Sequence, residues 1–151
     1  MKRFVLFFAF FSTAFWAVAQ DQKRVQSFNL EKGLAVQGYD VVAYFSGKPV
    51  KGNASLAAVY QGVRYHFANE ANKETFKKNA AKYEPQYGGW CAYAMGANGE
   101  KVEIDPETFK IVNGKLYLFY NKRFNNTLKT WNRDEQSLKA KADANWSKLL
   151  H

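Results

Sequence analysis

The stretch that decides the fold is Leu56-Ala57-Ala58-Val59-Tyr60-Gln61-Gly62-Val63-Arg64-Tyr65-His66-Phe67. Two runs rich in aromatic and β-branched residues flank Gln61-Gly62, a pair typical of a tight turn between antiparallel strands. Alternation in the second run places Arg64 and His66 on one face of the strand and its three apolar residues on the other. The pattern predicts a β-hairpin with one apolar face.

Helical turns are predicted on both sides of this hairpin. Upstream, Asp40 is placed to cap a short helical turn over residues 41–45 that ends at Gly47. Downstream, Asn69 is placed to cap a helix from Glu70 to about Asn79, with acidic residues near its start and lysines near its end. The hairpin is therefore expected to pack against local helices.

A second hairpin is predicted further along the chain. The runs 110–112 and 115–120 enclose Asn113-Gly114, a pair that favours the positive φ angles of a type I′ turn. Lys101 to Ile104 reads as a strand before it, and Asp105-Pro106-Glu107 has the N-cap and first-turn proline of a short helical turn.

The rest of the second half is predicted to be helical. The run 92–95 is either a short helix that stops at Gly96 or an extended segment, because five residues show no clear periodicity. Two helices, 122–132 and 134–150, are expected at the end of the chain. In the last one, one apolar face directed at the small sheet contains Leu138, Ala142, Trp146 and Leu149. The predicted fold class is α+β: a small antiparallel sheet of hairpins with short helices, and two C-terminal helices packed on it.

Residues 1–19 have the pattern of an export signal. Lys2 and Arg3 precede a short apolar run over 4–18, and Ala17-Val18-Ala19 resembles a cleavage site. The run is shorter than the roughly 20 residues that cross a bilayer, which argues against a permanent membrane anchor. We therefore expect a mature domain over 20–151 in the periplasm or the secreted fraction. Loss of Lys2 and Arg3 lowers its formal net charge from +9 to +7, and export argues against a nucleic-acid partner for this basic protein.

Cys91 is the only cysteine of the 151 residues, so it has no partner for an internal disulfide. It is either buried and inert, paired with another molecule, or kept for the chemistry of its sulfur. Gly88-Gly89 before it would permit close approach of a ligand, and a helix start would favour the thiolate. Burial among Trp90 and Tyr93 is the competing interpretation.

Two kinds of site are open around Cys91. Together with His66 and Met95, its sulfur would suit a soft metal such as copper. A surface or half-buried imidazole and a core methionine are nevertheless the favoured explanations of the last two. Alternatively, aromatic side chains line a cleft for a small ligand, or simply form the core of the domain. The candidate ligand-binding residues are Tyr65, Tyr87, Trp90 and Tyr93.

The pattern Tyr60-x-Gly62-x-x-Tyr65-His66-Phe67, followed by Phe76, Asn79 and Lys82-Tyr83, resembles the YHS domain. The wider frame, from the segment 38–45 through 87–93 to 142–146, is similar to an exported single-domain branch of that family. The resemblance implies a metal-linked role in some members and, in the exported branch, members with selenocysteine at the position of Cys91. It therefore adds weight to redox chemistry at this position.

The chain also departs from the metal-linked members of the family. Those carry an early Cys-Gly-Met motif and two cysteines around the start of the central helix. Here Gly38-Tyr39-Asp40 replaces the motif, and Ala68 and Asn72 stand at the two cysteine positions. A cysteine-rich metal cage is excluded, because Zn²⁺ normally takes four side-chain ligands and one thiol is present.

The sequence thus leads to three hypotheses of function. The first is an exported binding module that holds a soft metal or a small ligand around Cys91. The second is a thiol-dependent oxidoreductase with Cys91 as its redox centre, which would need an external thiol because no resolving cysteine is present. The third is a structural domain that contacts envelope proteins and buries an inert Cys91.

Overall fold

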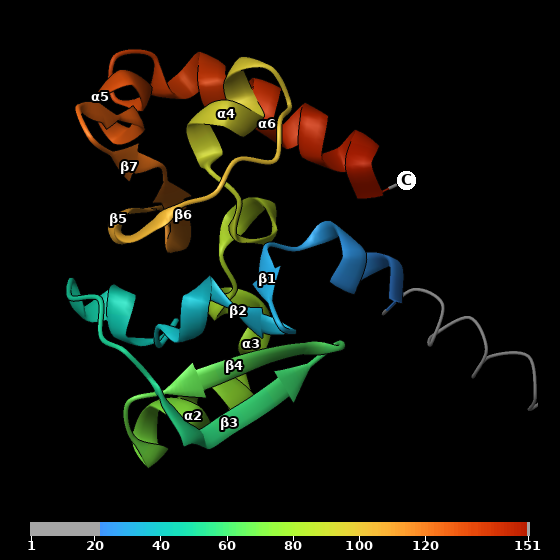
Figure 1. The fold of residues 1–151 in the computed structure, drawn as a ribbon, viewed down its shortest axis with the longest axis vertical. Coiled ribbons are helices and arrows are strands. Elements are labelled where there is room, and N and C mark those ends of the chain that lie inside the picture. The colour runs from blue at the N-terminus through green and yellow to red at the C-terminus, as the bar shows by residue number, and fades with distance from the viewer. Residues whose placement is uncertain (1–21, 151) are drawn as a thin grey trace, which may run out of the picture.

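The computed structural model describes residues 22–150, so the export signal predicted over 1–19 lies outside the described residues (Figure 1). Helices and strands mix along the chain, which confirms the α+β class. After a helix over residues 22–27, the elements are β1 (Leu30–Glu31), β2 (Leu34–Ala35), η1 (Val36–Gly38), η2 (Ala43–Ser46), β3 (Asn53–Tyr60), β4 (Val63–Phe67), α2 (Glu70–Lys78), α3 (Ala80–Tyr83), η3 (Gln86–Gly89), α4 (Ala92–Ala97), β5 (Asp105–Val112), β6 (Lys115–Phe119), β7 (Asn121–Lys122), β8 (Asn125–Asn126), α5 (Thr127–Trp131) and α6 (Glu135–Leu150).

The first hairpin belongs to a four-stranded sheet of order β1-β2-β4-β3, which lies in the lower half of Figure 1. β3 and β4 pair antiparallel around Gln61 and Gly62, whose φ angles of 46° and 81° confirm the predicted tight turn. β2 runs parallel to β4, a pairing the hairpin pattern does not predict. The apolar face of β4 packs on α2, where the Phe76 ring lies 4.7 Å from that of Tyr65 between centroids.

The second hairpin forms as predicted, with β5 and β6 joined by Asn113 and Gly114 at φ angles of 50° and 70°. β6 is buried on both faces and separates two cores. Leu116 and Leu118 belong to the lower cluster, which also contains Val41, Tyr44, Val63, Tyr65, Phe67, Phe76, Cys91 and Ile104. Tyr117 and Phe119 belong to the upper cluster, which also contains Tyr87, Ala92, Met95, Trp131, Leu138 and Ala142. A near-continuous apolar run is what a strand covered on both sides requires.

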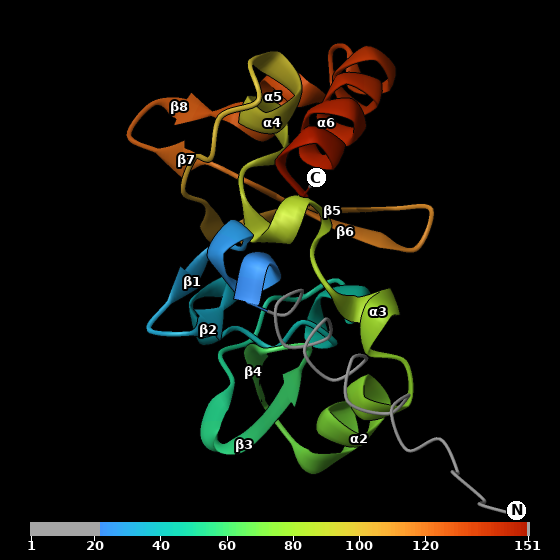
Figure 2. The same ribbon diagram turned by 90° about the vertical axis from the view of Figure 1, so that its right-hand side faces the viewer.

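Helices α4, α5 and α6 form the upper half of the molecule (Figures 1 and 2). The run after Cys91 is helical, but it does not stop at Gly96 as predicted: α4 continues to Ala97. Gly96 serves packing instead, because a Cβ at this position would lie 2.4 Å from the carbonyl oxygen of Leu138 in α6. α6 therefore crosses α4 at close range, while Leu149 at its end is 38% exposed.

Three further local predictions, for residues 101–104, 105–107 and 122–132, are wrong. Residues 101–104 form no strand; the N–H of Cys91 donates to Val102 O at 2.9 Å, but no ladder follows. The carboxylate of Asp105 does accept the N–H of Glu107, yet the chain continues as β5 because Asp105 pairs with Phe119.

The predicted helix over 122–132 is shorter than expected. Residues 121–126 form the β7–β8 hairpin, with Arg123 at φ 57° in its turn. α5 begins only at Thr127, where the Asn126 side chain accepts the N–H of Leu128 at 3.1 Å.

Among the residues described, none of the helices combines the length and apolar character needed to span a membrane.

Candidate functional site

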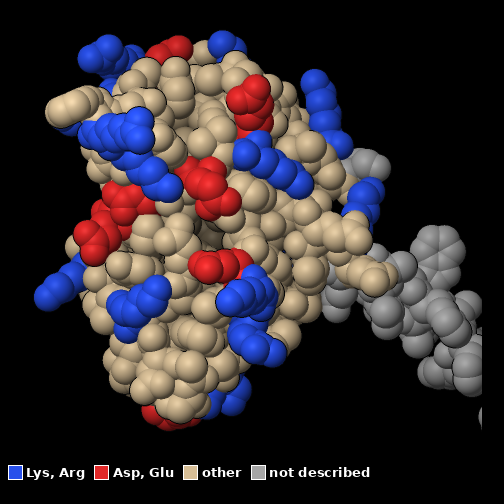
Figure 3. All heavy atoms as spheres, in the orientation of Figure 1, with Lys and Arg blue, Asp and Glu red and all other residues tan. Residues whose placement is uncertain are grey.

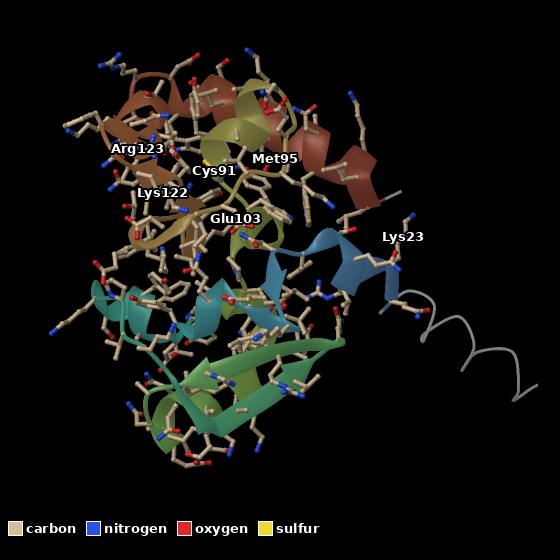
Figure 4. The ribbon with its side chains drawn as sticks, in the orientation of Figure 1. Lys23, Cys91, Met95, Glu103, Lys122 and Arg123 are labelled. Carbon is tan, nitrogen blue, oxygen red and sulfur yellow. The ribbon has the colours of Figure 1, made fainter. Side chains whose placement is uncertain are left out.

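Cys91 lies between η3 and α4, in the interior of the molecule (Figure 4). Its side chain has no exposed surface, and it belongs to the lower cluster. Trp90 beside it is only partly buried, and its indole N–H donates to Ser27 O at 2.7 Å. Of the interpretations left open above, the buried thiol is the one the structure shows.

The sulfur of Cys91 is part of a closed hydrogen-bond circuit with two other residues. The Tyr120 N–H donates to Sγ at 3.3 Å, and the Thr127 hydroxyl donates to Tyr120 O at 2.8 Å. Thr127 Oγ1 also lies 3.4 Å from Sγ. Because the Thr127 proton is used on Tyr120 O, the S–H of Cys91 is the donor to Thr127 Oγ1. The circuit is complete for a protonated thiol, and it fastens β6 to the start of α5.

Burial predicts that Cys91 does not react in the folded protein. We expect alkylation of the native chain to be on the order of a thousandfold or more slower than alkylation in denaturant, because Sγ becomes accessible only when the structure opens. An Ala144→Cys variant supplies the control, since Ala144 is exposed on α6 and should react at once. Equal rates at both thiols in mass-spectrometric labelling would contradict the buried assignment.

Of the other two proposed metal ligands, Met95 is near Cys91 in the chain and His66 is far from it. Met95 is fully buried in the upper cluster, one helical turn after Cys91. His66 lies on β4, at the opposite end of the molecule from α4 (Figures 1 and 2). Within residues 22–150, no group of three or more His, Cys, Asp or Glu side chains could hold a metal ion. The three-ligand site is therefore not assembled in this structure, because His66 lies far from Cys91.

The positions that the family resemblance aligns with metal-binding cysteines converge on Asp40. This carboxylate is fully buried; its Oδ1 accepts the N–H groups of Val42 at 2.9 Å and Ala43 at 3.3 Å. Its Oδ2 accepts the N–H of Ala68 at 2.8 Å and the side-chain amide of Asn72 at 2.7 Å. Hydrogen-bond donors surround both oxygens, so a carboxylate network joins η2, β4 and α2 at these positions.

The candidate ligand-binding aromatics are spread over both cores. Tyr65 is fully buried and donates its hydroxyl to Glu84 Oε1 at 2.5 Å. Tyr87 is nearly buried and donates to Asp143 Oδ1 at 2.9 Å. Burial raises the pKa of both phenols well above the ordinary value, and their carboxylate partners raise it further. Tyr93 is partly buried and packs against both clusters, so these aromatics serve mainly as core.

Tyr87 nevertheless lines a cleft of about 350 Å³, and so does Glu84, which accepts the hydroxyl of Tyr65. The cleft lies where the helix over 22–27, η3 and the end of α6 come together (Figures 1 and 2). Its lining combines aromatic walls with charged groups: Arg24, Phe28, Ala81, Glu84, Pro85, Gln86, Tyr87, Gly88, Asp143, Trp146, Ser147 and Leu150. It is the site that gathers the most of the predicted ligand-binding chemistry.

The backbone of η3 forms the floor of this cleft. Tyr87 has a φ of 54°, a conformation that is uncommon for a residue with a side chain. Gly88 follows at φ 60°, and a Cβ there would lie 2.8 Å from the Trp146 ring and 3.0 Å from that of Phe28. The glycine pair noted in the sequence thus allows two aromatic walls to approach the backbone.

An ion pair forms the charged end of the cleft. Arg24 pairs with Glu84, and its guanidinium lies 4.2 Å from the Phe28 ring centroid. Its Nε atom is buried and has no hydrogen-bond partner. Sequence reasoning missed Arg24 and Glu84, because neither belongs to a local motif. It indicated Tyr87, Gly88 and Trp146 of the lining.

A separate hollow of about 300 Å³ lies between the two halves of the molecule. It is lined by Glu31, Glu103 and the polar side chains of Asn29 and Gln37, among others. Figure 3 shows acidic side chains gathered around a hollow in the middle of this face, and Figure 4 places Glu103 below the buried Cys91. The acidic hollow is therefore distinct from the position of the thiol.

Comparison with known proteins gives one match. No curated protein and no solved structure was found to match the chain. Residues 41–87 match the YHS domain, and this segment runs from the Asp40-capped turn through both strands of the first hairpin to Tyr87 in the floor of the cleft. The chain therefore carries a YHS domain over residues 41–87.

Proposed function

We propose that this protein is an exported binding module, and that a small organic ligand lies in the cleft of Tyr87 rather than on the sulfur of Cys91. The observation that carries the proposal is the cleft itself. It combines the apolar walls Phe28 and Trp146 with the charged pair Arg24 and Glu84. Ligand pockets typically have about 300 to 1,000 Å³ and a few fixed polar groups on apolar walls.

The lining indicates the chemistry of the ligand. The lining contains two carboxylates, Glu84 and Asp143, and one guanidinium, that of Arg24, so its formal charge is −1. Arg24 pairs with Glu84, and Lys139 outside the lining pairs with Asp143. Aromatic rings on its walls attract flat apolar groups and cations. A small molecule with an aromatic or apolar body and one cationic or hydrogen-bonding group fits this combination.

A metal or redox function at Cys91 has less support. The YHS family is associated with metal binding, in particular with copper. In this chain, however, Cys91 offers one buried sulfur whose hydrogen bonds are already made, and His66 lies at the other end of the molecule. A reaction at the thiol would first require the β6–α5 contact to open.

Export is the second part of the proposal, and the signal pattern of residues 1–19 supports it. The mature protein would then start near Gln20, shortly before the helix that brings Arg24 and Phe28 to the cleft. The intact mass of the protein from a periplasmic extract tests this: loss of residues 1–19 is expected, and a full-length cytoplasmic product would contradict export.

Binding in the cleft can be tested with fragments of the expected chemistry. We expect tyramine at millimolar concentration to shift the NMR signals of the Trp146 indole and of the amides of residues 86–88, with 4-hydroxyphenylacetate weaker because the cleft has a negative net charge. Ser147→Trp should abolish the shifts, since Ser147 is exposed and lines the cleft.

Lys141→Trp is the matched control, because Lys141 is exposed on the same helix but does not line the cleft. It should leave tyramine binding unchanged. Signals at residues 86–88 and 146 that do not respond to either fragment, or that respond equally in the Ser147→Trp variant, would exclude this cleft as the ligand site.

A further inference from the structure

A second depression, of about 400 Å³, lies beside His66 on the polar face of β4. It is lined by Glu31, Lys32, Leu34, Gln37, Gly38, Lys51, Arg64 and His66. The lining comes from the β1–β2 turn, from η1, from the segment before β3 and from β4 itself. Residues distant in sequence thus bring three cationic side chains and the only internal histidine to one place.

The positive charge of this depression is largely uncompensated. Within the described part of the chain, no salt bridge involves Lys32, Lys51 or Arg64. Glu31 is the one carboxylate in the lining, so the formal charge is +2 with a neutral His66. Like charges held together on a surface raise its electrostatic potential and attract anions.

Two of the groups are held in position. Lys51 Nζ donates a hydrogen bond to Gln37 O and lies 4.9 Å from the Tyr39 ring centroid. Gly52 lies against the backbone and Cβ of His66, and Gly38 lies near its imidazole. A Cβ on Gly52 would overlap His66 Cβ at 2.7 Å, and a Cβ on Gly38 would lie 3.5 Å from His66 Nδ1. The arrangement is therefore built by packing and does not depend on free surface side chains alone.

The rim of the depression also has unusual backbone conformations. Val36, Gln37 and Gly38 have successive φ angles of 50°, 52° and 80°. A left-handed conformation is rare for a β-branched residue such as Val36 and is strained. The turn persists because Val36 is buried and the Gln37 side chain donates to Ile104 O at 3.2 Å. It places the Gln37 carbonyl where Lys51 binds it.

We propose that this depression is an anion site that holds a small oxyanion, either a phosphate or a carboxylate group of a soluble molecule. Arg64 supplies a planar guanidinium, which matches both oxyanions in geometry, and Lys51 supplies a fixed point charge. His66 supplies a ring N–H at the same place. The positive charges of Lys32, Lys51 and Arg64 favour an anion over a cation in this depression.

The protonation of His66 should respond to the anion. Partial burial lowers the pKa of His66, and Arg64 and Lys51 lower it further. Lys32 and Glu31 are the remaining charged groups of the lining. A bound oxyanion compensates these cations, so it raises the pKa of His66; by linkage, the anion binds more tightly as the pH falls through that pKa.

The experiment follows the imidazole signals of His66 by NMR against pH, with and without inorganic phosphate and, separately, citrate. We expect either anion to raise the pKa of His66 and to shift the amides of residues 36–38 and 64–66. Lys51→Gln and Arg64→Gln should each weaken the binding about five- to tenfold, the effect of losing one charged partner. The tighter of the two anions identifies phosphate or carboxylate as the preferred group.

Lys129→Gln is the matched control, since Lys129 is exposed on α5, away from the depression, and its loss changes the net charge equally. It should leave the affinity unchanged. An equal loss in Lys129→Gln would reduce the effect to general charge attraction and overturn the site. A His66 signal that is insensitive to both anions would also overturn the site. This holds even if the protein then sediments with anionic lipid vesicles, because binding to a lipid surface alone is not the proposed function of the depression.

Discussion

Replacing Asp40 by alanine is expected to lower the free energy of unfolding by about 4 kcal/mol. The carboxylate is fully buried and accepts four hydrogen bonds, from Val42, Ala43, Ala68 and Asn72. Its removal leaves the N–H groups of Val42 and Ala68 and the side-chain amide of Asn72 without this acceptor. The Ala43 N–H keeps the backbone oxygen of Asp40 at 3.1 Å. Urea unfolding followed by circular dichroism measures the change.

Asp40→Asn should be nearly as harmful as alanine, because an amide offers one acceptor oxygen where the carboxylate offers two, and its NH₂ would face donors. Asp105→Ala is the matched control. Asp105 also accepts two local hydrogen bonds, from Glu107 and Thr108, but it is only half-buried, so about 1 kcal/mol is expected. If Asp40→Ala and Asp105→Ala cost the same, the Asp40 network does not join the three elements.

The second large effect is expected at Gly96, where alanine should destabilise the protein by about 2 to 3 kcal/mol. In an exposed helix this change would stabilise by about 1 kcal/mol, because alanine favours helix more than glycine does. Here the added methyl group would lie 2.4 Å from Leu138 O and 3.0 Å from Leu138 C. Those are backbone atoms of α6, so the whole helix would have to move away from α4.

The same unfolding measurement tests this prediction. Ala97→Ser adds one heavy atom at the next position of α4, which is exposed, and should change stability by less than about 0.5 kcal/mol. A Gly96→Ala protein as stable as the parent would show that α4 and α6 are not in close contact. The position of Trp146 over Gly88 depends on the same helix, so tyramine binding should also weaken in Gly96→Ala.

Local features of the fold could be predicted because each depends on a few neighbouring residues. Gln61-Gly62 and Asn113-Gly114 form turns with positive φ angles, and Asn69 accepts the N–H of Asn72 at the start of α2. The predictions that failed lie in 101–107 and 121–126. There the local preference was weak, and the pairing of Asp105 with Phe119 or of Asn121 with Asn126 decided the outcome.

The candidate site was predictable only in part. The sequence indicated the glycine pair, Tyr87 and Trp146, but it left Cys91 undecided between a reactive and a buried thiol. Burial depends on what covers a residue, and Cys91 is covered by Tyr120 and Thr127 from segments 29 and 36 residues away. Likewise, His66 was grouped with Cys91 by chemical type, whereas the fold places it among Lys51 and Arg64.

By itself, the sequence determined the two hairpins, the capped helix α2, the YHS domain over 41–87 and the absence of a cysteine cage, because each follows from residue types at short spacing. Only the tertiary structure decided that the lone thiol is buried, that Asp40 joins the positions aligned with metal-binding cysteines, and that Arg24, Glu84 and Trp146 share a cleft. The physical reason is that burial and charge depend on contacts between distant segments, which form only when the chain packs.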